Sequence, residues 1–227
     1  MSRPIVYGQP AHLHVRSVLF ALAEKDVVYR VKPRDEMPLL GGQSPGGRFG
    51  VPILDVGGHL VQGAETVLRF VADAFAGPAL QPAEARERAR MNGALELNYR
   101  EATSTLGSQI AGRYIAALVS SDWLDPKPSE DVLADARKTV AEFERILQDD
   151  PFLAGPVLSL ADIALASLLD NIMETPDREL VVPANSRLGL WWERVSSRKA
   201  FQATRPEGGA LFGFMYPPKL IEEQETG

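Results

Sequence analysis

The stretch VPILDVGGHLVQGAETVLRFVADAF, residues 51–75, changes its periodicity halfway along and decides how the first third of the chain folds. Residues 51–56 and 59–61 are short and rich in β-branched residues, which predicts two strands. The pair Gly57–Gly58 between them is typical of a hairpin turn. From residue 63 to residue 75 apolar residues recur every three or four positions, which predicts a helix. The apolar face of this helix would consist of Val67, Phe70, Val71 and Ala74.

A strand–helix–strand unit precedes this stretch. Ile5–Tyr7 and Val27–Val31 read as short strands, and residues 14–24 between them have apolar residues at helical spacing. Such a unit implies two parallel strands joined by a right-handed crossover. Residues 41–50, GGQSPGGRFG, contain five glycines and one proline and therefore read as a loop.

The pattern changes after residue 76 to long helices. Residues 76–85, AGPALQPAEA, read as a linker, and helices are predicted over residues 84–119, 130–147 and 159–172, with a fourth beginning at Leu188. Ser159 is the expected N-cap of the third helix, with Asp162 reaching back to it in a capping box. We therefore predict an N-terminal α/β domain over residues 1–76, a linker over 77–88, an all-helical domain over 89–205 and an irregular tail over 206–227.

Composition excludes several classes of function. The net charge is −6, so nothing favours nucleic acid as a partner. The chain has no cysteine, which excludes disulfides and a protein cysteine nucleophile. No uncharged apolar run reaches the ~20 residues that a membrane span needs, and no signal peptide is visible. We expect a cytoplasmic protein without membrane contact.

Three motifs, in this order, resemble those of the cytosolic glutathione transferases, in particular the phi-like and bacterial enzymes. They are VYGQPAHLHVRSVLFALAEK (residues 6–25), the stretch over 51–75, and FLAGPVLSLADIALASLL (152–169). The resemblance covers residues 3–205. It implies a thioredoxin-like N-terminal domain that binds most of the glutathione, followed by an all-helical C-terminal domain.

The resemblance assigns glutathione contacts to four residues of the second motif. The family keeps a cis bond before the proline of its Val-Pro pair, which would leave the backbone N–H and C=O of Val51, next to Pro52, free to pair with glutathione like an added strand. Glu65 would bind the ammonium group of the γ-glutamyl end. Thr66, with the N–H groups of the helix N-terminus, would bind its carboxylate.

The first motif should hold the catalytic group. His12 occupies the position where phi-like enzymes carry a serine that donates a hydrogen bond to the glutathione sulfur. A free thiol has a pKa near ~8.5, so a positioned donor raises the reactive thiolate fraction. The helix dipole disfavours an imidazolium at this place, so a neutral donor is expected. Tyr7 and His14 are the alternatives. His12 could instead mark a site that has lost its activity.

Other parts of the site are less defined by the sequence. Phi-like enzymes carry a lysine or histidine for the glycine carboxylate of glutathione, whereas residues 35–50 of this chain contain neither. Arg48 and Gln43 are the available donors there. The wall of the electrophile pocket should come from residues 91–114. Its candidate residues are Asn98, Tyr99, Gln109, Arg113 and Tyr114. No metal site is expected, since His12, His14 and His59 have no evident further ligand.

The function predicted from these residues is a glutathione transferase that conjugates glutathione thiolate to a hydrophobic electrophile in detoxification. Glutathione is a co-substrate, no cofactor is bound, and a homodimer is expected. A non-catalytic homologue that serves as a binding or protein-interaction module is the first alternative. A glutathione-dependent peroxidase is the second.

Overall fold

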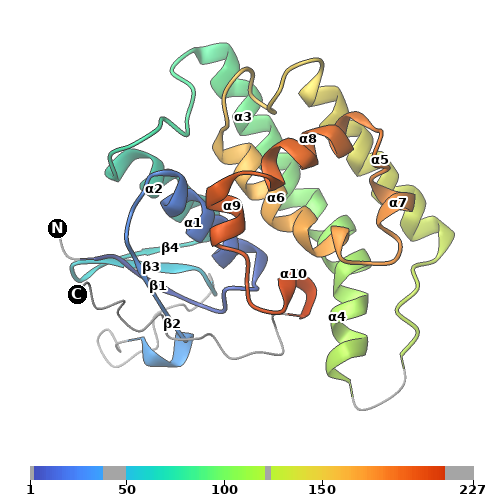
Figure 1. Ribbon diagram of the computed structural model, residues 1–227, viewed down its shortest axis with the longest axis horizontal. Coiled ribbons are helices and arrows are strands. Elements are labelled where there is room, and N and C mark those ends of the chain that lie inside the picture. Colours follow the sequence, from blue (N-terminus) through green and yellow to red (C-terminus); the bar gives the residue numbers. More distant parts are fainter. Residues whose placement is uncertain (1–2, 38–49, 121–123, 213–227) are drawn as a thin grey trace.

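The computed structural model describes residues 3–37, 50–120 and 124–212 (Figure 1). Its sheet has the strand order β2-β1-β3-β4, with β1 (Ile5–Tyr7), β2 (Arg30–Lys32), β3 (Ile53–Val56) and β4 (His59–Gln62). β1 runs parallel to β2 and antiparallel to β3, and the hairpin pairs β3 with β4. Helices α1 (Leu13–Glu24) and α2 (Ala64–Ala74) lie together between the sheet and the helical remainder.

The remainder of the described chain is helical. A short turn, η1 (Arg34–Glu36), follows β2. The π-helical segment η2 continues α3 directly into α4, with Gly112 N–H donating to the carbonyl five residues earlier. The helices after the sheet are α3 (Ala85–Leu97), η2 (Asn98–Ala111), α4 (Gly112–Val119), α5 (Glu130–Leu147), α6 (Leu160–Met173), α7 (Arg178–Val181), α8 (Arg187–Ser196), α9 (Lys199–Ala203) and α10 (Gly209–Phe212). None of the described helices is long and apolar enough to cross a membrane.

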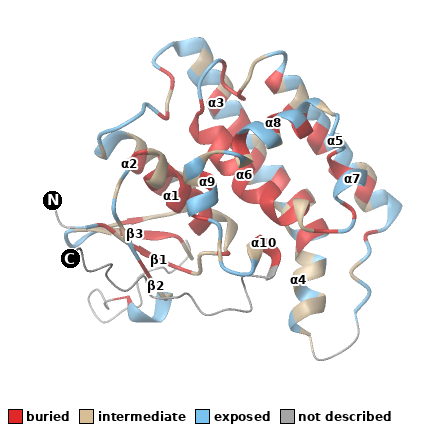
Figure 2. Ribbon diagram, in the orientation of Figure 1, coloured by how far each residue is buried: buried red, intermediate tan, exposed pale blue. Residues whose placement is uncertain are grey.

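Helix α6 is the centre of the core and is buried on nearly every side (Figure 2). The predicted capping box is present: Asp162 Oδ2 accepts from the Ser159 N–H at 2.9 Å and from its hydroxyl at 2.7 Å. Asp162 Oδ1 also accepts from the Leu153 N–H and from Trp191 Nε1, each at 2.8 Å. One carboxylate thus starts the core helix and joins it to α8.

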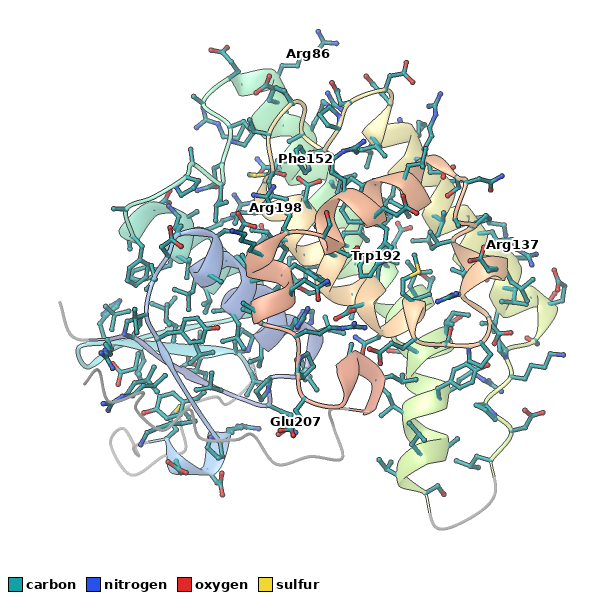
Figure 3. All side chains as sticks on the ribbon, viewed as in Figure 1. Arg86, Arg137, Phe152, Trp192, Arg198 and Glu207 are labelled. Carbon is teal, nitrogen blue, oxygen red and sulfur yellow. The ribbon has the colours of Figure 1, made fainter. Side chains whose placement is uncertain are left out.

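Helix α1 is fastened to the C-terminal helices by charged contacts at two points. Arg198, labelled in Figure 3, donates to both carboxylate oxygens of Glu24 at 2.6 and 2.7 Å. Arg16, which is 2% exposed, lies 3.1 Å from Asp170 of α6 and donates to the carbonyl oxygens of Phe201 and Thr204. The helix that begins beside His12 is therefore fixed against α6 and α9.

Several predicted boundaries were wrong. β2 begins at Arg30 rather than at residue 27, because the three residues of β1 pair only with 30–32. On α2, Leu68 is buried and Ala74 is exposed, so the buried face is shifted from the predicted one. By contrast, α3 begins at Ala85, within one residue of the start predicted for the helix over 84–119.

The predicted irregular tail contains a helix. α10 forms at residues 209–212 because the Glu174 carboxylate accepts from the N–H groups of Ala210 and Leu211 at 2.8 and 2.7 Å. A carboxylate at this position satisfies donors that have no partner within the helix. The domain boundaries themselves stay a prediction.

Candidate active site

His12 lies in the turn between β1 and α1 and is the N-cap of α1. Its Nδ1 accepts a hydrogen bond from the His14 N–H at 3.3 Å. A neutral imidazole that accepts at Nδ1 carries its proton on Nε2. Burial lowers the pKa of His12, so the ring is neutral near pH 7. The turn therefore holds a neutral N–H donor, as the helix dipole argument predicted.

The two alternatives to His12 are placed differently. Tyr7 is 2% exposed and packs with Met37 and Ile53, so it fills a small core rather than a site. The ring of His14 packs against that of Tyr99, with ring centroids 5.4 Å apart. Burial, and then the nearby His12, lower the pKa of His14 to about 4. His14 is thus a second neutral imidazole beside His12.

The Val51–Pro52 bond is cis, as the resemblance predicts. Within the described residues, neither the N–H nor the C=O of Val51 takes part in a backbone hydrogen bond. Gly8 brings this segment against α1: a Cβ at Gly8 would lie 2.5 Å from Val15 and 3.2 Å from Val51. Because Gly8 has no side chain, the backbone of Val51 lies beside the turn that holds His12.

Glu65 lies in the first turn of α2, and its carboxylate is held in place. Arg69 donates two hydrogen bonds to Oε1, at 2.9 and 2.7 Å, and is itself bonded to Gln81 and Asn92. Both of these bonds use Oε1, and among the described residues nothing bonds to Oε2 of this half-exposed side chain. The carboxylate is oriented and keeps one oxygen for a cation.

The N-terminus of α2 has no side-chain cap. Its N-cap is Gly63, with φ 92°, and Thr66 in the first turn is exposed. The N–H groups of the first turn of a helix have no partner within the helix, and they favour an anion. This end of α2 therefore offers a carboxylate and free N–H donors side by side, which is the chemistry that binds an amino acid zwitterion.

The electrophile-pocket candidates do not gather in one place. Tyr99 lies against His14, whereas Asn98 is 1% exposed and buried. Arg113 donates to the carbonyl oxygens of residues 125–127, in the segment before α5. Tyr114 donates to the Asp177 carboxylate. Tyr99 is therefore the candidate that the structure brings to the α1 turn.

Two further predictions concern residues around the site. Arg48, like Gln43, lies outside the described residues. His59 is exposed at the sheet edge, with its ring 6.2 Å from that of Phe70. No group of three or more His, Asp or Glu side chains that could hold a metal ion is found in the described part of the chain.

Comparison with known proteins finds glutathione transferases both by sequence and by fold. The family model for the glutathione S-transferase C-terminal domain matches residues 124–203. Glutathione S-transferase F9 of Arabidopsis thaliana is 26% identical over 210 residues, covering 88% of this chain and 94% of the relative. The chain is thus similar to glutathione transferases over most of its length. Glutathione S-transferase 3 of Zea mays is 27% identical over 210 residues, covering 88% of this chain and 91% of the relative.

Solved structures show that the chain shares the fold of glutathione transferases. A structure of glutathione S-transferase-I bound with lactoylglutathione aligns with a TM-score of 0.77 at 21% identity, covering 89% of this chain and 98% of that one. At 21% identity this alignment shows a shared fold and nothing more. The shared fold is the four-stranded sheet followed by helices that was described above.

Sequence reasoning missed two residues of the site. Arg69 stands four residues after Glu65, a spacing that pairs charges on one helix face and could have been recognised. Asn92, which Arg69 also contacts, comes from α3. No local pattern indicates that α2 and α3 lie side by side, so this contact could not be read from the sequence.

Proposed function

We propose that this protein binds glutathione and transfers its thiolate to an electrophilic small molecule. Three complementary features support the proposal: the backbone of Val51, which has no backbone hydrogen bond to the described residues, the oriented Glu65 at an uncapped helix N-terminus, and the neutral imidazole of His12. The relatives named as glutathione S-transferases support it.

In this proposal each part of glutathione has a partner. The cysteinyl backbone pairs with Val51 next to Pro52, as an added strand does. Oε2 of Glu65 accepts from the γ-glutamyl ammonium group. Thr66 and the N–H groups of the first turn of α2 bind the γ-glutamyl carboxylate. Arg48 is proposed for the glycine carboxylate on the basis of sequence alone.

His12 would act on the sulfur. Its Nε2–H donates a hydrogen bond to the thiolate and stabilises it, because Nδ1 is already occupied by the His14 N–H. Stabilising the anion lowers the thiol pKa and increases the nucleophilic fraction near neutral pH. The thiolate then attacks the electrophile: a carbon–sulfur bond forms, and in a substitution the halide leaves with the bonding pair. A homodimer, common among symmetric oligomers, is part of the proposal.

A conjugation assay tests the reaction. The purified protein is mixed with glutathione and a chlorodinitrobenzene, and formation of the thioether is followed by absorbance. The proposal predicts turnover that falls at least about 10-fold in His12→Ala and survives in Tyr7→Phe. Thioether formation no faster than in buffer would contradict it and would favour a non-catalytic binding module. Reduction of an organic hydroperoxide without conjugation would favour a peroxidase.

A further inference from the structure

The start of α1 carries two histidines, and the proposed function uses the ring of only one of them. The ring centroids of His12 and His14 lie 5.4 Å apart, and the ring planes are inclined at 53°. Both side chains are half-buried, so solvent still reaches them. The pair therefore presents ring nitrogen atoms beside the place where the proposed glutathione sulfur lies.

The polar atoms of the His14 ring have no structural role. The ring packs on that of Tyr99, with centroids 5.4 Å apart, and its nitrogen atoms form no hydrogen bond to the residues that the structure describes. Burial, and then the nearby His12, lower the pKa of His14 to about 4, so the ring is neutral near pH 7. A neutral imidazole keeps one nitrogen lone pair, which is available to a ligand.

The separation of the two rings suits a shared metal ion. Imidazole nitrogen binds zinc at about 2.0–2.1 Å, and two imidazoles on one tetrahedral ion bring their ring centroids to about 5 Å. The observed separation of 5.4 Å is close to this value. The χ2 torsion of histidine has broad minima, so a small rotation of each ring can direct both nitrogens to one point.

The two imidazoles do not complete a metal site by themselves. Zinc sites in proteins usually have at least three ligands besides water, and the described residues contain no group of three or more His, Asp or Glu side chains that could hold an ion. The N-terminus of a helix also disfavours a bare cation. The missing ligand should therefore be an anion that arrives with the substrate. The glutathione thiolate beside His12 is such an anion, and this step rests on the proposed function.

We propose that His12, His14 and the sulfur of bound glutathione together form a site for a zinc-type divalent cation. Imidazole and thiolate are ligands that this class of ion prefers. A zinc–sulfur bond forms as the thiol loses its proton to the buffer. Zinc undergoes no redox change, so the step needs no oxidant or reductant.

Zinc and the catalytic hydrogen bond exclude each other at His12. In the protein without zinc, Nδ1 of His12 accepts from the His14 N–H at 3.3 Å and Nε2 carries the proton. When zinc binds Nε2, this nitrogen gives up its proton and Nδ1 takes one, so the glutathione sulfur loses its donor. The cap bond that is lost as well is long at 3.3 Å and therefore weak. Zinc should thus be a reversible inhibitor of conjugation.

Equilibrium dialysis of zinc against the full chain tests the site. It is carried out with glutathione and with S-methylglutathione, whose sulfur cannot form a thiolate. Zinc should bind at least about 10-fold more tightly with glutathione, and it should tighten glutathione binding by the same factor, because the coupling of two ligands is reciprocal. Dialysis with glutathione and zinc but no protein corrects for complexes that form in solution.

Two histidine variants separate this site from zinc binding elsewhere. His14→Asn keeps its backbone N–H and should retain glutathione binding. It should lower zinc affinity at least about 10-fold, the effect that loss of an outer partner of a metal ligand already has. His59→Asn is the matched control, since His59 is exposed at the sheet edge and packs on Phe70 instead, and it should leave zinc affinity unchanged. Zinc should slow conjugation by the wild type, and a chelator should restore it.

The outcomes distinguish this inference from the proposed function. Equal zinc affinity with glutathione and S-methylglutathione, or equal zinc affinity of the wild type and His14→Asn, overturns the zinc site. A wild-type protein that binds glutathione in a calorimetric titration but retains no zinc also overturns it and leaves the transferase function standing. A wild-type protein that binds no glutathione overturns both.

Discussion

Replacing Asp162 by asparagine should destabilise the whole chain, although the two side chains have nearly the same shape. Asp162 is fully buried and accepts four hydrogen bonds: two from Ser159, one from the Leu153 N–H and one from Trp191 Nε1. Asparagine keeps one carbonyl oxygen for Leu153 and Trp191, but its NH₂ group faces the Ser159 N–H, which loses its acceptor.

The expected loss can be worked out from these bonds. A buried donor left without an acceptor costs about 1–3 kcal/mol, and a bond to a charged group contributes about 1.5–3 kcal/mol. Asp162→Asn should therefore lower the free energy of unfolding by about 3 kcal/mol. Asp162→Ala leaves three N–H donors unpaired and removes the capping box, so it should cost about 5 kcal/mol. Domains are stable by about 5–15 kcal/mol in total.

Urea unfolding followed by circular dichroism measures this loss. With a slope of about 3 kcal/mol per molar urea, the asparagine variant should unfold at a midpoint about 1 M lower, with the slope unchanged. Asp135→Asn is the control, because the Asp135 side chain forms an exposed ion pair with Lys138, and it should cost less than about 1 kcal/mol. If Asp162→Asn unfolded at the midpoint of this control, the reasoning about the four bonds would be refuted.

Three further predictions follow from single contacts. Gly8→Ala should lower both stability and glutathione affinity, since φ is +142° and the new Cβ would lie 2.5 Å from Val15; unchanged urea midpoints and affinity would contradict this. Burial lowers the pKa of His14 to about 4 in the folded chain, against about 6.5 when unfolded. As the pH falls through this window only the unfolded state takes up the proton, so the free energy of unfolding should fall by up to about 3 kcal/mol. His14→Asn should flatten that part of the stability curve, and an unaltered curve would count against it. Arg16→Met leaves the buried Asp170 without its nearest cation and should cost about 3–5 kcal/mol; the double variant with Asp170→Leu should recover part of this in thermal unfolding.

The features that the sequence predicts correctly are local ones. The helix over 130–147 has the bounds that its apolar spacing predicts, because an amphipathic helix between two breaks is determined by neighbours three and four residues apart. The Gly57–Gly58 hairpin and the Ser159–Asp162 capping box likewise depend on residues close together in the chain. Local interactions of this kind are visible without a structure.

The features that could not be predicted join distant segments. Trp191 reaches Asp162 across 29 residues, and Arg16 reaches the carbonyl of Thr204 across 188. Tyr99 could be named as a pocket candidate, but its contact with His14 depends on how η2 packs on α1. β2 is shorter than its β-branched run because the length of its partner β1 limits the pairing. In each case tertiary packing determines the contact or the strand length, and the local sequence pattern does not contain that information.

The most direct measurement is a calorimetric titration of reduced glutathione into the wild-type protein, with Glu65→Ala and Glu96→Ala measured alongside. Glu96 of α3 forms an exposed ion pair with Arg100 of η2 and serves as the matched control. We predict binding between micromolar and low millimolar glutathione, lost in Glu65→Ala and retained in Glu96→Ala. No heat of binding at several millimolar glutathione, or equal binding by the wild type and Glu65→Ala, would contradict the assignment of this site to glutathione.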